Sequence, residues 1–551
     1  MPSETHPISG PTAELRPLLS RTHLLLGLIL LGAALLRLAR LDLMAFEMDE
    51  GAACIVAVRY MRYGLLPLVG IKTSLQFYNS PLFIYVLSPI FLVATDPRCA
   101  AAFFALLGTA AVYVVYRTGR EFFSPAVGLL AAAMMAVSPS AIEYSRRLWG
   151  HSLIQILCPV AFYLLLRWVV SGRPKAIFWL ALIAAAAQQF HFSGALLWVQ
   201  IILVWLLFRP RTDWVALVCG LALGLLSYWP FFFAQTFKDF LDLRIIGDAI
   251  GRGTGQPWRF DLQKLLYWLF AATDFGHNNF LQQGLGAFLA QIPLYRATRA
   301  IVAAAWVGGL VACGIRATRG LRGSDKWQSL REGGAAKPII LLTWSLVPLV
   351  AFLSLRVPVV APYFLVVYPA PFLAIAWLVV QIWQRLEAWR KTIAIRQGLR
   401  RVVFFLFAAW VVHQLAFYIV LRASLESKGG GKGSYVSFGR QQAAMRFVAN
   451  HAPGQTVMIS EEHLDPSRGI DYRYWYLLWT FDRNMERFFP KNREKAEYWY
   501  LIRNMNYRVR SDFQQFLDFC PFQEFEPLRV YVIPRPGPWP RFGPAPPPSP
   551  T

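Results

Sequence analysis

The sequence predicts an all-α membrane protein that crosses the bilayer about eleven times and carries a small C-terminal α/β domain. Of its 551 residues, 56% are apolar and only 16% are charged, whereas about a quarter are charged in a soluble protein. The apolar residues are concentrated in runs close to span length, and the sequence after the last run is polar and mixed. These observations argue against a soluble enzyme and against a disordered chain.

Basic residues are in excess, with 55 Lys and Arg against 31 Asp and Glu and a formal net charge of +24. They lie mostly between the apolar runs, where positive charge accumulates beside membranes. We therefore expect membrane lipids, and no nucleic acid, as their partners. The six cysteines show no CxxC spacing, so the sequence predicts neither a disulfide framework nor a cysteine metal site.

The predicted spans follow from the apolar runs, because a span needs about 20 predominantly apolar residues. Runs of this kind cover 23–41, 99–116, 124–138, 150–170, 176–190, 192–208, 214–232, 299–316, 338–355, 361–382 and 402–421. A further run, 81–95, is short and is broken by Pro81, Ser88 and Pro89, so we expect a re-entrant or interfacial element there. A split span elsewhere would raise the number to thirteen.

The basic connectors orient the chain, because cytoplasmic loops carry an excess of Lys and Arg. With residues 1–22 in the cytoplasm and eleven spans, the basic stretches 316–337 and 383–401 fall inside. We therefore expect a multi-pass protein of the cell membrane, with its N-terminus cytoplasmic and its C-terminal domain extracytoplasmic, either periplasmic or lumenal. The outer face then also holds the loops 42–98, 139–149 and 233–298.

The C-terminal part differs in kind from the rest. Residues 441–450 have the pattern of an amphipathic helix, and 456–460 that of a β-strand. The composition then divides the chain into the spanning region 23–421, a linker at 422–434, an α/β domain at 435–533 and a Pro-rich, disordered tail at 534–551.

Three carboxylates, Glu47, Asp49 and Glu50, directly follow the first span and precede a helical pattern. Charged groups at a membrane surface are costly unless they are used or solvated. One interpretation is structural, because acids stabilise the N-terminus of a helix. The other is catalytic, because a carboxylate held near lipid head groups can act as a general base.

Two arginines, Arg146 and Arg147, lie in the short outer loop against the expected charge bias. Guanidinium groups bind phosphate bidentately, so this pair could hold a lipid phosphate, and Arg356 beside the last outer connector could assist. The alternative is that they are snorkelling side chains anchored in head groups.

Further polar and aromatic side chains interrupt the apolar sequence near the same predicted face. They could bind a sugar or a phosphate, or they could be ordinary turns with interfacial aromatic anchors. The candidates for substrate binding are Tyr78, Asn79, His151, His191 and Tyr363. No phosphate-binding glycine loop is present in the sequence, so transport driven by ATP is not expected.

Taken together, these segments resemble the lipid-dependent glycosyltransferases of the C superfamily. The closest branch is the dolichyl-phosphate-mannose protein mannosyltransferase group, which includes the bacterial aminoarabinose lipid A transferases. The resemblance extends over roughly residues 20–420. It rests on the Asp-Glu pair after the first span, the Asn-Ser-Pro-Leu return at 79–82, Tyr-Ser-Arg-Arg-Leu-Trp at 144–149, Gln-Phe-His-Phe-Ser at 189–193 and Tyr-Phe-Leu-Val-Val-Tyr-Pro at 363–369.

The resemblance implies a polyprenyl-phosphate-linked sugar as donor and a protein, lipid or glycan as acceptor. The essential acid of the family falls on Asp49, with Glu50 beside it, and the phosphate ligands fall on Arg146 or Arg147 and on Arg356. No nucleotide or redox cofactor is expected, because the sugar–phosphate bond is already activated. Several members carry a basic residue where this chain has Asn79-Ser80. Some carry a second acid where it has 149–151, which argues against a bound divalent metal.

A transporter of lipid or polysaccharide is the alternative function, and a scaffold that displays the C-terminal domain is a third. A transporter places its polar residues near the bilayer midplane, between symmetric halves. Here the polar residues gather at one predicted face, and no repeat relates the two halves. A scaffold would not need carboxylates and arginines in the outer loops.

The predicted orientation can be tested by labelling single cysteines in intact cells. We expect a cysteine at Gly323, in a basic connector, to be shielded from a membrane-impermeant thiol reagent, and a cysteine at Gly431, in the linker, to be labelled. Labelling at Gly323 would contradict both the orientation and the placement of the site.

Overall fold

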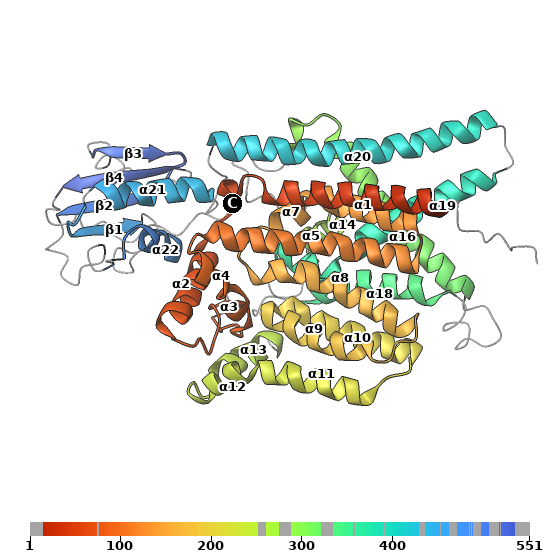
Figure 1. Cartoon of the computed structure of the whole chain (residues 1–551), viewed down its shortest axis with the longest axis horizontal. Coiled ribbons are helices and arrows are strands. Elements are labelled where there is room, and N and C mark those ends of the chain that lie inside the picture. Colours follow the sequence, from red (N-terminus) through yellow and green to blue (C-terminus); the bar gives the residue numbers. More distant parts are fainter. Residues whose placement is uncertain are drawn as a thin grey trace, which may run out of the picture.

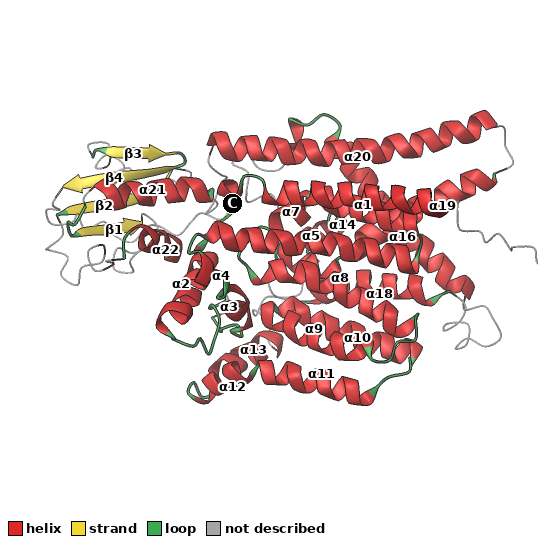
Figure 2. Cartoon of the chain, in the orientation of Figure 1, coloured by secondary structure: helices red, strands yellow, loops and turns green. Residues whose placement is uncertain are grey.

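The structure is a computed structural model in which a lengthwise bundle of helices carries a sheet domain at one end (Figures 1 and 2). It describes residues 15–73, 76–251, 260–274, 288–320, 334–355, 359–389, 393–428, 436–451, 453–461, 471–483, 485, 488, 497–505, 517 and 520–534. Arg356, residues 429–434 of the predicted linker and the tail from 535 onward lie outside the described residues, whereas residues 422–428 of that linker are helical.

The first half of the bundle runs from the N-terminus to residue 251. Its helices are α1 (Leu15–Leu38), η1 (Leu41–Leu43), α2 (Met48–Tyr63), α3 (Leu82–Leu87), α4 (Ile90–Val93), α5 (Pro97–Phe122), α6 (Pro125–Val137), α7 (Pro139–Tyr144), α8 (Gly150–Val169), α9 (Ala176–Phe190), η2 (Phe192–Ala195), α10 (Leu196–Phe208), α11 (Trp214–Ser227), α12 (Trp229–Thr236) and α13 (Leu241–Gly251).

The second half completes the bundle. Its helices are α14 (Leu262–Leu269), α16 (Tyr295–Gly320), α18 (Ala336–Ser354), η4 (Ala361–Val367), α19 (Ala370–Ala388) and α20 (Ile393–Lys428). Small residues allow close packing between neighbouring helices. A Cβ built on Gly119 of α5 would lie 2.5 Å from the Cα of Gly128 in α6.

Within the described residues, six helices are long and apolar enough to cross a membrane, or up to eight if each bent pair is one span. The bent pairs are α11 with α12, at 48°, and η4 with α19, at 54°. Proline lies at the start of the second helix in both pairs. Its ring is tolerated in a first helical turn but not in a helix interior, so these prolines start a new helix at each bend. The chain is therefore a multi-pass membrane protein.

The apolar runs of the sequence correspond to these helices with two refinements. The runs 214–232 and 361–382 are each divided by a bend, which apolarity alone does not reveal. The short run 81–95 forms α3 and α4, which meet at Ser88 and Pro89.

The C-terminal domain contains α21 (Phe438–His451), β1 (Val457–Glu461), α22 (Tyr472–Phe481), β2 (Tyr498–Asn504), β3 (Phe522–Phe525) and β4 (Leu528–Pro534). The strands form one sheet in the order β1-β2-β4-β3, in which only β1 and β2 are parallel. Helix α21 and strand β1 occupy the segments expected for a helix and a strand.

The C-terminal domain packs directly on α2 (Figure 1). A Cβ built on Gly51 of α2 would lie 2.5 Å from the backbone nitrogen of Arg473 in α22. The Tyr476 hydroxyl donates to the Thr95 carbonyl at 2.6 Å, and the Gln441 amide donates to the Phe46 carbonyl at 2.8 Å. The domain is thereby fixed to the helix that begins with the three carboxylates.

This close contact predicts that Gly51→Ala weakens the docking of the C-terminal domain. The added methyl group would meet backbone rather than a side chain that can move, and overpacking of this kind costs about 1–3 kcal/mol. Gly27→Ala in α1 is the matched control, because nothing lies within 4 Å of its Cβ position. We expect a lower midpoint of thermal unfolding, and faster proteolysis between the domains, in the Gly51 variant only. Equal behaviour of the two variants would contradict the prediction.

Candidate active site

The acidic segment begins helix α2. Glu47 occupies the N-cap in an extended conformation, and the Glu50 carboxylate accepts a hydrogen bond from the Glu47 backbone N–H at 3.0 Å. This is the arrangement of a capping box. Asp49 lies between them and takes no part in the box. The capping interpretation therefore applies to Glu47 and Glu50 and leaves Asp49 unexplained.

Arg147 binds both capping carboxylates. Its Nη2 lies 2.6 Å from Glu50 Oε1 and 3.1 Å from Glu47 Oε2, and its Nε donates to Glu50 Oε1 at 2.7 Å. Glu50 is fully buried and Arg147 is only 6% exposed. Burial raises the pKa of Glu50 to about 7, against the opposing effect of the Arg147 charge. This ion pair joins the start of α2 to the loop between α7 and α8.

Asp49 is the partly exposed carboxylate beside this pair. Burial raises the pKa of Asp49, as do the negative charges of Glu47 and Asp471, while Arg147 and a hydrogen bond with Trp149 lower it. A carboxylate with a raised pKa is a better proton acceptor near neutral pH. Among the described residues Asp49 forms no ion pair within 4.0 Å, so Trp149, and no cation, is the side-chain partner of its carboxylate.

Arg146 points elsewhere. Its guanidinium is completely buried, donates to the Arg40 carbonyl at 2.6 Å and to the Tyr418 hydroxyl at 3.3 Å, and lies 3.7 Å from Glu143. Arg422 shares the same glutamate at 2.6 Å. The structure thus brings Arg147 to the carboxylates and places Arg146 among internal partners. Arg356 lies outside the described residues.

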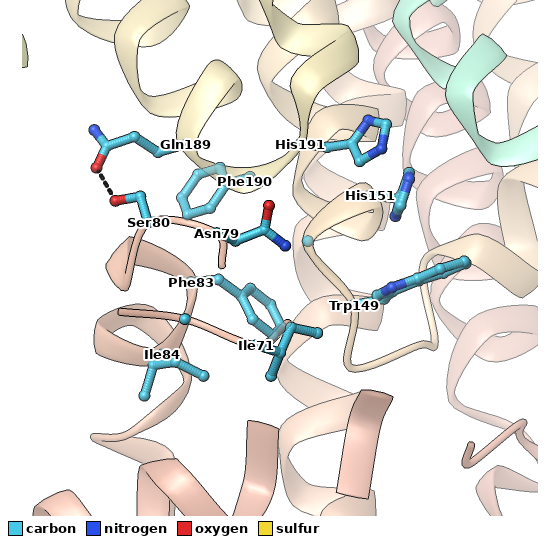
Figure 3. Close-up of a pocket in the computed structure, with 12 residues that line it drawn as sticks. Ile71, Asn79, Ser80, Phe83, Ile84, Trp149, His151, Gln189, Phe190 and His191 are labelled. Carbon is cyan, nitrogen blue, oxygen red and sulfur yellow. Dashed lines mark hydrogen bonds between the residues drawn. The ribbon is translucent and has the colours of Figure 1, made fainter. Parts of the chain in front are cut away.

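A pocket lies beside Trp149, which forms part of its lining (Figure 3). It is formed where the return segment before α3 meets the start of α8 and the end of α9. Its lining residues are Gly70, Ile71, Asn79, Ser80, Phe83, Ile84, Trp149, Gly150, His151, Gln189, Phe190 and His191. Three of the five predicted substrate-binding residues, Asn79, His151 and His191, therefore share one pocket.

Aromatic rings form one continuous stack at this pocket. The ring centres of His151 and His191 are 3.7 Å apart, and Tyr363 stacks on His151 at 5.4 Å with an angle of 8° between the planes. Trp149 lies 4.2 Å from His151 on one side, and the Arg147 guanidinium covers the Trp149 ring at 4.4 Å. The stack connects the carboxylate cluster with the pocket.

The return segment is fixed from two directions. The Ser80 hydroxyl donates to the Gln189 amide oxygen at 2.6 Å (Figure 3). The Tyr78 N–H donates to Asp242 at 3.0 Å, and the Lys238 ammonium lies 3.9 Å from the centre of the Tyr78 ring. Tyr78 is not among the residues that line the pocket, although the neighbouring Asn79 is. Its ring instead faces Lys238, in the segment between α12 and α13.

Sequence reasoning missed the contribution of the C-terminal domain. Asp471 and Arg473 begin α22, and Arg473 lies 3.3 Å from Asp471 and 3.7 Å from Glu461 at the end of β1. Burial raises the pKa of Glu461 to about 7. These residues are more than 400 positions from Asp49 in the sequence, and only the packing of α22 on α2 brings them near it. No local motif could have identified them.

The comparisons with known proteins agree with the predicted resemblance. A family model described as dolichyl-phosphate-mannose-protein mannosyltransferase matches residues 79–232. That range includes Asn79, Arg147, His151 and His191, but it begins after Asp49. No curated protein sequence matches the chain.

Two solved structures share the fold. The chain is similar to ArnT from Cupriavidus metallidurans in the apo state, with a TM-score of 0.52, 11% identity and coverage of 94% of this chain and 98% of that one. For ArnT bound to undecaprenyl phosphate the TM-score is 0.50 and the identity 11%, with coverage of 95% of this chain and 98% of that one. The archaeal oligosaccharyltransferase AglB from Archaeoglobus fulgidus, in complex with an inhibitory peptide and a dolichol-phosphate, gives a TM-score of 0.49 and 12% identity. The match covers 88% of this chain and 69% of that one.

The different partners of the two neighbouring acids predict different losses of stability. Glu50→Gln removes the buried charge that Arg147 faces, and breaking a buried pair costs about 3–5 kcal/mol, reduced here because Glu47 remains as a partner. Asp49→Asn breaks no ion pair and leaves the capping box intact. We expect a clearly lower unfolding midpoint in detergent for Glu50→Gln and a nearly unchanged one for Asp49→Asn. The reverse order would contradict this description of the ion pair.

Proposed function

We propose that the chain is an integral-membrane glycosyltransferase that moves a sugar from a polyprenyl-phosphate donor to a protein, lipid or glycan acceptor at the extracytoplasmic face. The family match over 79–232 and the fold shared with ArnT, one structure of which is bound to undecaprenyl phosphate, support this proposal. The observation that carries it is the environment of Asp49, a partly exposed carboxylate that has no ion pair among the described residues, lies within the field of buried Arg147 and is hydrogen-bonded with Trp149 of the uncharged pocket lining.

Asp49 is the general base in this mechanism. It takes the proton from an acceptor hydroxyl or amine while the oxygen or nitrogen of that group attacks the anomeric carbon of the sugar. The bond between this carbon and the phosphate oxygen breaks, and its electron pair leaves with the polyprenyl phosphate. Glu50 is a positioning residue, because it is fully buried and acts through Arg147.

The leaving phosphate gains negative charge and needs a cation. Arg147 can supply one without losing its anchor, because Glu50 holds it from the buried side and the half-exposed Glu47 is a partner that a phosphate can replace. Arg356 remains the second proposed phosphate ligand. Arg146 remains a prediction from sequence without support from its contacts, which are all internal.

The remaining predicted residues belong to the substrate side of the same site. Asn79, His151 and His191 line the pocket, while Tyr363 stacks on it. Tyr78 meets Lys238 at its edge.

We propose the predicted topology as well. If each bent pair is one span, there are eight long spans among the described residues, and three of the shorter apolar segments, α6, α9 and η2–α10, bring the number to eleven when they also cross. This places the C-terminal domain and the carboxylates on one side, outside the cytoplasm. The family match and the shared folds all concern transferases, and none of them favours the transporter alternative.

The test of this function is sugar transfer by the purified protein. Asp49→Asn keeps the size of the side chain but cannot accept the proton, and loss of a general base lowers the rate by about 10²–10⁴-fold. Asp42→Asn is the matched control, because Asp42 lies in η1, shortly before Asp49 in the sequence, and among the described residues its ion pair is with exposed Arg40. We expect transfer from polyprenyl-phosphate sugars by the wild type and by Asp42→Asn, and almost none by Asp49→Asn.

Transfer by Asp49→Asn at the wild-type rate would refute Asp49 as the base. Failure of the folded wild-type protein to use any lipid-phosphate sugar in a broad panel of acceptors would refute the proposed function.

A further inference from the structure

The pocket beside Trp149 has an uncharged lining. Its twelve described lining residues include no Asp, Glu, Lys or Arg. They offer aromatic faces, such as Trp149 and Phe190, together with the amide of Asn79 and the two imidazoles. In Figure 3 the Asn79 side chain extends from the return segment toward the side of the pocket that carries the histidines.

His151 is the unusual member of this lining. It is only 5% exposed, and neither of its ring nitrogens has a hydrogen-bond partner among the described residues. Buried polar groups in native proteins are nearly always paired, because an unpaired one loses its interaction with water and gains nothing. His191, by contrast, is held by the Ser193 hydroxyl at 2.7 Å. The unpaired imidazole therefore points to a ligand that supplies both a donor and an acceptor.

A neutral imidazole carries one N–H donor and one acceptor nitrogen, which suits the hydroxyl groups of a sugar. The aromatic faces suit the apolar C–H face of such a ring. A phosphate or a carboxylate would find no cation in the described lining, and an ammonium group would find no anion. Burying such a charge without a partner is costly.

Trp149 gives the pocket its place in the reaction. This residue interacts with Asp49 and Arg147, and it also contacts His151 of the pocket lining. A sugar ring in the pocket would thus present its anomeric carbon to the carboxylate at the boundary that Trp149 forms.

Building on the proposed function, we propose that this pocket holds the sugar ring of the donor, that it selects a neutral, hydroxyl-bearing sugar over an amino sugar or a uronic acid, and that His151 binds the sugar hydroxyl groups.

Equilibrium binding to the purified full-length protein tests the proposal without relying on turnover. The probes are bare undecaprenyl phosphate, undecaprenyl phosphate carrying mannose and undecaprenyl phosphate carrying 4-amino-arabinose. The wild type should bind the mannosyl lipid most tightly. His151→Phe keeps a ring of similar size but loses both hydrogen bonds, so its affinity for the mannosyl lipid should fall by about tenfold, with no change for the bare lipid phosphate.

Two further variants sharpen the comparison. His413→Phe is the matched control, because His413 lies on α20 outside the pocket and its Nδ1 also has no hydrogen-bond partner among the described residues. This variant should bind all three lipids as the wild type does. His151→Gln retains a donor and an acceptor, so it should recover most of the affinity that His151→Phe loses. It also keeps the test open if the phenylalanine variant fails to fold.

Each contrary result has a distinct meaning. Equal weakening of the bare and the mannosyl lipid by His151→Phe would show that the pocket holds phosphate, and unchanged binding of both would show that His151 contacts no ligand. Tighter or equal binding of the aminoarabinosyl lipid by the wild type would overturn the selection of a neutral sugar. Each of these overturns the inference and leaves the proposed transferase intact. Absence of binding to every lipid phosphate would overturn both.

Discussion

The buried ion pair between Arg147 and Glu50 is the interaction on which the candidate site depends. Removing two charges from water costs several kcal/mol per ion, and only good geometry recovers that cost. Arg147 meets the requirement with two contacts to Glu50 and a third to Glu47. The same contacts fix the loop after α7 against the start of α2. The loop in turn fixes Trp149, over which the guanidinium stacks, and with it one wall of the pocket.

The C-terminal domain extends this arrangement from the other side. Helix α22 rests on α2 at a point where only glycine fits, since a Cβ on Gly51 would lie 2.5 Å from the Arg473 backbone. The contact brings the charge of Asp471 toward Asp49, and this charge raises the pKa of Asp49 in addition to the effect of burial. The domain therefore takes part in setting the chemistry of a residue that belongs to the membrane region.

Much of the architecture was predictable, because burial in a bilayer imposes a pattern on the sequence that burial in a small site does not. The apolar runs located the helices, and the interruption at Ser88-Pro89 located the break between α3 and α4. The carboxylate segment and the histidines were identifiable as unusual residues in an apolar sequence. The way these residues group in space could not be predicted. Adjacent Arg146 and Arg147 look equivalent in sequence, yet they bind different partners. The role of Asp471 depends on a contact between the two ends of the chain.

The division of roles among the three acids follows from an account of their partners. Glu50 is fully buried, with Arg147 on one oxygen and the Glu47 N–H on the other, so no substrate can reach it. Glu47 occupies the N-cap of α2 and contacts Arg147. A phosphate could replace it as a partner of Arg147, but its position at the N-cap is structural. Only Asp49 combines partial exposure, a raised pKa and freedom from ion pairing among the described residues. Its two neighbours satisfy the helix terminus and the arginine, and in doing so they leave the Asp49 carboxylate without a cation, as its proposed role in proton transfer requires.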